Sequence, residues 1–149
     1  MNLFGMLELS GSALGAERQR AEVVASNMAN AQTTRTPAGG PYRRQLVVFQ
    51  SQRTPRFSFA LNGALAGSLR QEASSAVRVA AVVADQRPPV MRFEPGHPDA
   101  NAEGYVAYPQ VDPIEEMTDL LGAVHAYQLN ASAVQATKNM ITQSLDLLR

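Results

Sequence analysis

The longest regular pattern in this chain is an apolar heptad near its C-terminal end. The apolar positions are Leu120, Tyr127, Val134, Ile141 and Leu148, seven residues apart, and Met117, Val124, Ala131 and Leu145 on the intervening four-residue step, which Lys138 interrupts. Just before the heptad, Asp112, Pro113 and Glu115 provide an N-cap, a first-turn proline and a capping-box glutamate. The pattern predicts one long helix over residues 112–149, with a seam for another helix.

The faces of this helix outside the seam are poor in charge. Residues 120–137 contain no Asp, Glu, Lys or Arg, whereas a helix with a free face in water carries charged residues there. Gly122, Ala123 and Ala126 also leave room for another backbone to approach closely. We therefore expect the helix to be covered on more than one side, and neighbouring subunits are the cover that the pattern favours.

A weaker heptad at the other end of the chain predicts a second helix over residues 1–33. Its two rows are Leu7, Leu14, Ala21 and Met28, and Leu3, Ser10, Val24 and Ala31, with Glu17 interrupting the second row. Such a diluted seam is marginal as an isolated helix, so we expect the two terminal helices to pair as a coiled-coil-like unit. Asn27 and Asn30 share one face and either fray with the helix end or contact the partner helix.

Residues 34–44 are predicted to be a linker with a Gly/Pro turn. Pro37, Gly39, Gly40 and Pro41 interrupt regular structure and supply turns. The segment lacks the lysine and the flanking strand and helix of a phosphate-binding loop. The linker motif consists of Thr34, Arg35, Thr36, Pro37, Gly39, Gly40, Pro41, Tyr42, Arg43 and Arg44.

Residues 45–111 are predicted to be a small β-rich part inserted between the helices. Short apolar or alternating runs over residues 46–49, 76–83, 90–93 and 105–108 predict strands of one modest sheet. Residues 51–75 show no clean period and are predicted to be a mobile loop. The fold class that follows is α+β, with long N- and C-terminal helices and a β-rich insertion between them.

Charge is distributed in two opposite blocks, although the formal net charge of the 149 residues is zero. Residues 35–92 hold nine Arg against Glu72 and Asp85, and residues 93–119 hold seven acidic residues and no Lys or Arg. The blocks either complement each other within the chain, form two solvated faces, or attract each other between copies. The candidates for such docking between copies are Arg43, Arg44, Glu94, Asp99 and Glu103.

Catalytic and ligand-binding chemistry has little support in the sequence. Glu94, His97, Asp99 and Glu103 lie close together, but the prolines and glycine among them oppose a regular element, and no second His or Cys completes a metal site. The chain has no Cys, no Gly-x-Ser-x-Gly motif and no paired acid/base motif. We expect a protein that is not an enzyme and that uses no metal, cofactor or small-molecule substrate.

Other classes of partner can also be weighed from the sequence. The Arg-rich middle part leaves open an alternative function as a nucleic-acid-binding or other interaction module, although its Arg residues are scattered rather than clustered on one helix. The sequence has no run of eighteen consecutive apolar residues, so it predicts no membrane-spanning helix. Residues 1–30 lack a basic leader followed by an apolar core, so we expect no cleaved signal peptide.

One stretch carries a family resemblance. Asn27-Met28-Ala29-Asn30-Ala31, followed by the linker motif, resembles the signature of the bacterial flagellar rod, hook and hook-associated proteins. Residues 63–67, 94–106 and 115–128 resemble the same family, so the similarity spans most of the chain. The resemblance implies a structural subunit of the proximal rod that assembles through its terminal helices into the tubular drive shaft, which transmits torque.

The resemblance also implies partners and a location. The partners are copies of the chain, other flagellar rod proteins and the flagellar type III export apparatus, without nucleic acid. The location is the rod of the basal body, in the periplasmic space, reached without a cleaved signal peptide. The predicted subunit interface consists of Leu7, Leu14, Val24, Asn27, Met28, Asn30, Met117, Leu120, Leu121, Val124, Tyr127, Gln128, Val134, Ile141 and Leu145.

Overall fold

The fold of the chain is an antiparallel pair of long helices with a β-hairpin on one side and a smaller hairpin at one end. The computed structural model describes residues 3–54 and 74–146. In chain order the elements are α1 (Leu3–Ala29), β1 (Gln45–Thr54), β2 (Ser74–Ala84), β3 (Val90–Phe93), β4 (Tyr105–Tyr108) and α3 (Pro113–Asp146). The predicted α+β class, with terminal helices around a β-rich insertion, is confirmed.

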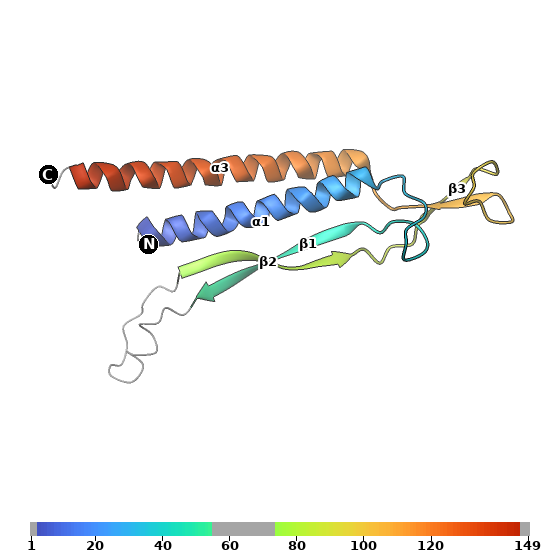
Figure 1. The fold of residues 1–149 in the computed structure, drawn as a ribbon, viewed down its shortest axis with the longest axis horizontal. Helices are drawn as coiled ribbons and strands as arrows, with labels where there is room; N and C mark the ends of the chain where they lie inside the picture. Colours follow the sequence, from blue (N-terminus) through green and yellow to red (C-terminus); the bar gives the residue numbers. More distant parts are fainter. Residues whose placement is uncertain (1–2, 55–73, 147–149) are drawn as a thin grey trace, which may run out of the picture.

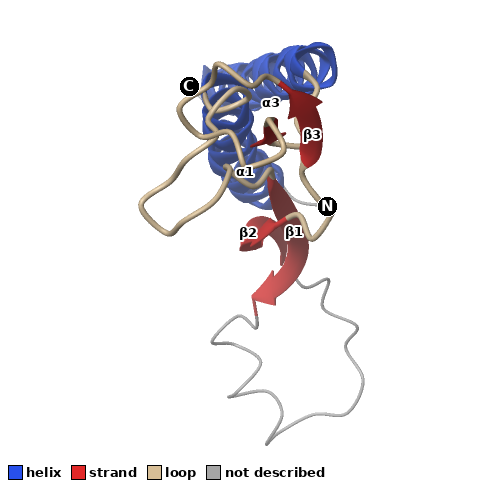
Figure 2. Cartoon of the chain, turned by 90° about the vertical axis from the view of Figure 1, so that its right-hand side faces the viewer, coloured by secondary structure: helices blue, strands red, loops and turns tan. Residues whose placement is uncertain are grey.

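The elements stack in three layers with α1 in the middle. Figure 1 shows α3 along one side of α1 and the β1–β2 hairpin along the other, with β3 beyond the end of the helix pair, and Figure 2 shows the same order from that end. Among the described elements, α1 contacts α3, β1 and β2, whereas α3 packs on α1 alone. Much of the surface of α3 is therefore not covered by another described helix or strand.

The helix ends follow the signals that predicted them. The backbone N–H of Ile114 donates to Asp112 Oδ1 at 2.9 Å, and the N–H of Glu116 donates to the Asp112 carbonyl at 3.0 Å, so Asp112 is the N-cap of α3. At the other helix, α1 ends at Ala29, four residues before the predicted end. There the N–H of Asn30 is shared between the carbonyls of Ser26 and Asn27, which is the pattern of a tightening last turn.

The surface between the two helices differs from the predicted seam. The residues of α3 that are buried are Glu116, Ala123 and Thr137. Of the predicted heptad, Leu120, Val134 and Ile141 are half-buried, while Met117, Val124, Ala131, Tyr127 and Leu145 are exposed. The prediction assigned the largest apolar residues to the intrachain seam. The fully buried positions are mostly small or polar, since those of α1 are Ser10, Ala16, Val24 and Asn27, and the larger Leu120, Val134 and Ile141 are only half-buried beside those of α3.

The β1–β2 hairpin packs on α1 and is longer than predicted. Its antiparallel register runs from Gln45 opposite Ala84 to Thr54 opposite Ser74, with an irregularity between Val48 and Phe49. Residues 51–54 and 74–75 therefore belong to strands, so the predicted loop boundaries at 51 and 75 are wrong, and the remainder, 55–73, lies outside the described residues. The N–H of Val77 donates to Ser12 Oγ at 3.0 Å, which ties β2 to α1.

A second hairpin forms from β3 and β4, so the prediction of one sheet is also wrong. The two hairpins make separate two-stranded sheets. Pro88 and Pro89 lie between β2 and β3 and cannot donate backbone hydrogen bonds, which prevents the ladder from continuing across the connection. Val106 on β4 is completely buried and forms the centre of this end of the molecule.

Gly104 is the last residue of the connection between β3 and β4 and has a backbone conformation that favours glycine. Its φ is +83°, and a Cβ there would lie 2.9 Å from Phe93 Cε2 and 3.2 Å from Pro95 Cβ. We expect Gly104→Ala to lower the free energy of unfolding by about 1–3 kcal/mol, because the left-handed backbone and the crowded ring both oppose a side chain. Gly96→Ala, with nothing within 4 Å of its Cβ position, is the matched control, and urea unfolding measures both. Equal stability of the two variants would contradict this account.

Candidate functional site

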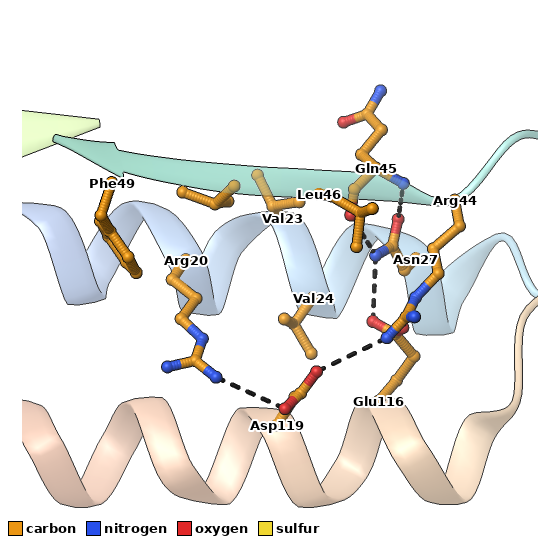
Figure 3. A pocket seen from close by; sticks show the side chains of 11 residues that line it. Arg20, Val23, Val24, Asn27, Arg44, Gln45, Leu46, Phe49, Glu116 and Asp119 are labelled. Carbon is orange, nitrogen blue, oxygen red and sulfur yellow. Dashed lines mark hydrogen bonds and ion pairs between the residues drawn. The ribbon is translucent and has the colours of Figure 1, made fainter. Parts of the chain in front are cut away.

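A buried polar cluster joins the end of α1, the start of β1 and the first turn of α3. Asn27, Arg44 and Glu116, which we call the junction cluster, have exposed fractions of 1%, 9% and 1%. Figure 3 shows the three side chains pointing toward one another between α1, β1 and α3. Because buried polar groups cost free energy unless they are paired, each partner in this cluster matters to the fold.

Asn27 uses all of the hydrogen-bonding capacity of its side chain. Its Nδ2 donates to the Gln45 carbonyl at 2.9 Å and to Glu116 Oε2 at 3.0 Å. Its Oδ1 accepts from the Gln45 N–H at 2.9 Å and from the Tyr42 hydroxyl at 3.0 Å. An Asn side chain has two donor hydrogens and two acceptor lone pairs, so Asn27 connects helix, linker, strand and partner helix with none left over.

Arg44 lies among three carboxylates of α3. Its Nε donates to Glu116 Oε1, its Nη1 lies 3.4 Å from Glu115 Oε1, and its Nη2 lies 3.5 Å from Asp119 Oδ2. Burial by itself lowers the pKa of Arg44, but the hydrogen bond to Glu116 and the charges of the three carboxylates together raise that pKa above its ordinary value. The guanidinium is therefore charged at every physiological pH, and Glu116 always has a cationic partner.

The two asparagines of the family-like motif have different roles. Asn27 reaches α3, whereas the Nδ2 of Asn30 donates to the carbonyl of Ser26 in its own helix at 2.9 Å. We expect Asn27→Ala to lower the free energy of unfolding by about 2–3 kcal/mol, because buried groups of Gln45 and Tyr42 lose their partner. Asn30→Ala, the matched control, should cost about 1 kcal/mol or less. Thermal unfolding followed by circular dichroism measures both, and a cost at Asn30 as large as that at Asn27 would refute the difference.

The linker motif folds as a tight turn and contacts the β3–β4 end of the molecule. The N–H of Gly39 donates to the Thr36 carbonyl and the N–H of Thr36 to the Gly40 carbonyl, both at 2.9 Å. Gly39 and Gly40 have φ of +88° and +75°, which explains why two glycines are adjacent here. Thr34 Oγ1 donates to Asp99 Oδ2 at 2.8 Å, so the linker positions the second hairpin.

The five residues predicted to dock between copies lie in different settings. Arg44 is buried inside the chain, contrary to a role at a surface between copies. Asp99 is held by Thr34 and lies 3.7 Å from Arg35. Glu94 Oε2 accepts from the Tyr108 hydroxyl at 2.8 Å, and this hydrogen bond is the main cause of a raised Tyr108 pKa. Arg43 and Glu103 are exposed. The two charge blocks therefore complement each other within the chain at Arg44 and at Arg35.

A row of apolar side chains on α3 faces away from α1. Ile114, Met117, Leu121 and Val124, which we call the exposed apolar row, have exposed fractions of 77%, 57%, 62% and 42%. Their spacing of three and four residues places them on one side of the helix. Gln128 and Ala131 continue the same line and are also exposed. This surface is the largest continuous part of the predicted subunit interface that the structure leaves uncovered within the subunit.

The described residues contain neither a cluster of candidate metal ligands nor a candidate membrane-spanning helix. Within residues 3–54 and 74–146, no three His, Asp or Glu side chains gather closely enough to hold a metal ion. No helix of the same ranges is long and apolar enough to cross a membrane. A groove beside the junction cluster, lined by Arg20, Val23 and Phe49 among others (Figure 3), also contains Glu116 and Asp119, whose carboxylates pair with Arg44 and Arg20.

Sequence reasoning missed Glu116 as a central residue. In the sequence, Glu116 stands out only as one residue of the acidic block and of the family-like stretch that begins at residue 115. A heptad analysis passes over it because it follows apolar positions. A signal was nevertheless present: Glu116 lies exactly one heptad before Ala123 and three heptads before Thr137, which are the other buried residues of α3. An acidic residue on the row of smallest side chains indicates a buried partner of opposite charge.

Comparisons with known proteins agree with the resemblance along the whole chain. The family model described as flagella basal body rod protein matches residues 7–35, and the model described as flagellar basal body rod FlgEFG protein C-terminal matches residues 102–147. These two stretches include most of α1 and nearly all of α3.

Similar full-length proteins are found in distantly related bacteria. A protein of Bacillus subtilis named flagellar basal-body rod protein FlgC is 41% identical over 99% of this chain and 99% of its own length. Proteins of the same name from Borreliella burgdorferi and Salmonella typhimurium are 34% and 37% identical over 100% and 99% of this chain, and over 99% and 98% of their own lengths. This chain therefore belongs to the FlgC family of flagellar basal-body rod proteins.

Proposed function

We propose that this chain is a structural subunit of the flagellar rod and that it assembles through surfaces of its terminal helices and hairpins. The observation that carries this proposal is the imbalance between buried and exposed apolar residues. Among the described residues, the buried apolar side chains are Ala16, Val24, Val106 and Ala123, whereas eighteen large apolar side chains are exposed. Burial of apolar surface is the main stabilising term in folding and association, so this subunit has most of its apolar contacts still to make.

The positions of the exposed surfaces support an open assembly rather than a closed dimer. The exposed apolar row lies on α3, while Leu46, Val48 and Val83 are exposed on the β1–β2 hairpin at the opposite side of α1 (Figure 1). Contacts between different surfaces of identical subunits are head-to-tail, and such contacts produce rings, helical tubes or filaments. A tube built in this way from packed helices can transmit torque because its interfaces resist shear.

Finer features of the role are part of the same proposal. The names of the relatives place those proteins in the basal-body rod, and we propose the same location for this chain, in the proximal, periplasmic part. We also propose that the flagellar type III export apparatus delivers it and that its neighbours are copies of itself and other rod proteins. Exposed Arg43 and Glu103 are the remaining candidates for charge contacts between copies.

The nucleic-acid alternative is not supported by several of the described arginines, which are engaged within the chain. Arg44 is buried against Glu116, Arg87 pairs with Asp85 at 2.6 Å, and Arg92 lies over the ring of Tyr108 at 4.7 Å. A nucleic-acid interface needs cations that are free to contact phosphates. The relatives provide no support for it either, since their names describe rod proteins.

Genetic replacement tests the proposed function. Deleting the gene in its own bacterium should abolish swimming and yield basal bodies that lack a complete rod, and supplying the intact chain should restore both. The restored basal bodies, once purified, should contain the chain in a fixed ratio to other rod proteins, measured by quantitative mass spectrometry. Complete rods in the deletion strain, or purified basal bodies without the chain after restoration, would refute the proposal.

A further inference from the structure

The fully buried residues of α3, on the side that packs on α1, are not its large apolar ones. The buried residues of α3 are an acid, an alanine and a threonine, namely Glu116, Ala123 and Thr137. The exposed apolar row carries larger side chains, with Leu121 62% exposed and Met117 57% exposed. A rotation that presented this row to α1 would bury these large side chains and would uncover Leu120, Val134 and Ile141, which are half-buried now, so apolar burial alone does not choose between the two orientations.

A simple rotation of α3 would make that exchange. Successive residues of an α-helix are about 100° apart, so the exposed apolar row is centred about 120° around the helix from Glu116. The buried side chains of Ser10, Ala16 and Ala123 are small, so they interlock little and oppose such a rotation only weakly. Another interaction must therefore fix the orientation of α3.

The junction cluster provides that interaction, because the partners of Glu116 are not part of α3. Glu116 Oε1 accepts from Arg44 Nε and Glu116 Oε2 accepts from Asn27 Nδ2 at 3.0 Å. Arg44 immediately precedes β1, and Asn27 is bonded to the backbone of Gln45. Turning α3 would carry the carboxylate away and leave a buried guanidinium without its closest partner, which is costly.

We infer that Glu116, held by Arg44 and Asn27, sets the rotation of α3 about its own axis and keeps the exposed apolar row turned outward. The cluster acts as a specificity device, comparable to a polar residue in a coiled-coil seam that fixes alignment at some cost in stability. The occupant of the outward row, a rod subunit, rests on the proposed function. The orientation itself is a property of the single chain, so its failure and the failure of the proposed function are distinguishable.

Thiol labelling of the purified full-length chain tests this orientation, because the natural sequence contains no Cys. One protein carries Leu121→Cys, in the exposed apolar row, and another carries Ala123→Cys, on the buried face. Each is made with the junction cluster intact and with Arg44→Ala and Glu116→Ala combined, which removes both charges together. With the cluster intact, the thiol at position 121 should react with a maleimide about tenfold or more faster than the thiol at 123.

In the double-alanine proteins we expect the order of the two rates to reverse, with helical content retained. Adding Met117→Gln and Val124→Gln should restore the original order, because the row then gains nothing from burial. An unchanged order in the double-alanine proteins, equal rates with the cluster intact, or no restoration by the glutamines would each overturn the inference. Loss of helix both in the double-alanine protein and in Arg44→Gln with Glu116→Gln would also overturn it, since the cluster would then supply stability rather than orientation.

Discussion

Replacing the buried Arg44 with alanine is expected to lower the free energy of unfolding by about 3–5 kcal/mol. The reason is that Glu116, with 1% of its surface exposed, loses the cationic partner that offsets its burial. Urea unfolding followed by circular dichroism measures the loss. A decrease below about 1 kcal/mol would contradict the account of the junction cluster.

Arg43, the residue before Arg44 in the linker motif, provides the matched control for Arg44→Ala. Arg43 is exposed, so Arg43→Ala should change the free energy of unfolding by no more than about 0.5 kcal/mol. Combining Arg44→Ala with Glu116→Ala should recover part of the loss caused by Arg44→Ala alone, because no charge is then left buried without a partner. A double mutant that loses the sum of the two single losses would show that the residues act independently.

Placing a carboxylate on the exposed apolar row should leave the subunit folded and prevent its assembly. Leu121 is 62% exposed, so Leu121→Asp should change the free energy of unfolding by about 0.5 kcal/mol or less. If a neighbouring subunit covers this row, the buried charge costs several kcal/mol at every interface of the assembly. We therefore expect near-complete loss of the variant from purified basal bodies and loss of swimming.

Thr118→Asp is the control for charge on the same turn of α3. Thr118 is exposed but lies off the row, and its hydroxyl donates to the Ile114 carbonyl. This variant should be incorporated and should support swimming. Val134 and Ile141 are less suitable probes, because both are half-buried in the subunit and a charge there disturbs the helix pair as well. Normal incorporation of Leu121→Asp would remove this row from the interface.

The helices could be predicted from the sequence because their signals are local. Asp112 caps α3 as the order of Asp112, Pro113 and Glu115 indicates, and the hydrogen bond from the Ile114 N–H to its side chain is present. The heptads also located both helices correctly. They did not separate the half-buried apolar positions of α3, such as Leu120 and Ile141, from the exposed ones, such as Met117, because apolar periodicity does not distinguish a surface buried within the subunit from one kept for a partner.

The junction cluster could not be predicted because its contacts connect distant parts of the chain. Asn27 and Glu116 are 89 residues apart, and Arg44 and Glu116 are 72 residues apart. No period or motif spacing reports on such a pair, so the sequence leaves open whether the two charge blocks complement each other within the chain, are solvated, or attract each other between copies. The even spread of apolar residues likewise gave no sign that the prolines between β2 and β3 divide the strands into two hairpins.

The antiparallel layout gives the elongated molecule two unlike poles. The first described turn of α1 and the last described turn of α3 lie at one end, and the β3–β4 hairpin lies at the other (Figure 1). With 34 residues at about 1.5 Å each, α3 alone separates these ends by about 50 Å. Fluorophores attached near residues 4 and 145 would therefore report on the same pole, whereas one attached at Gly96 would report on the opposite pole and give the polarity of each subunit in an oriented assembly.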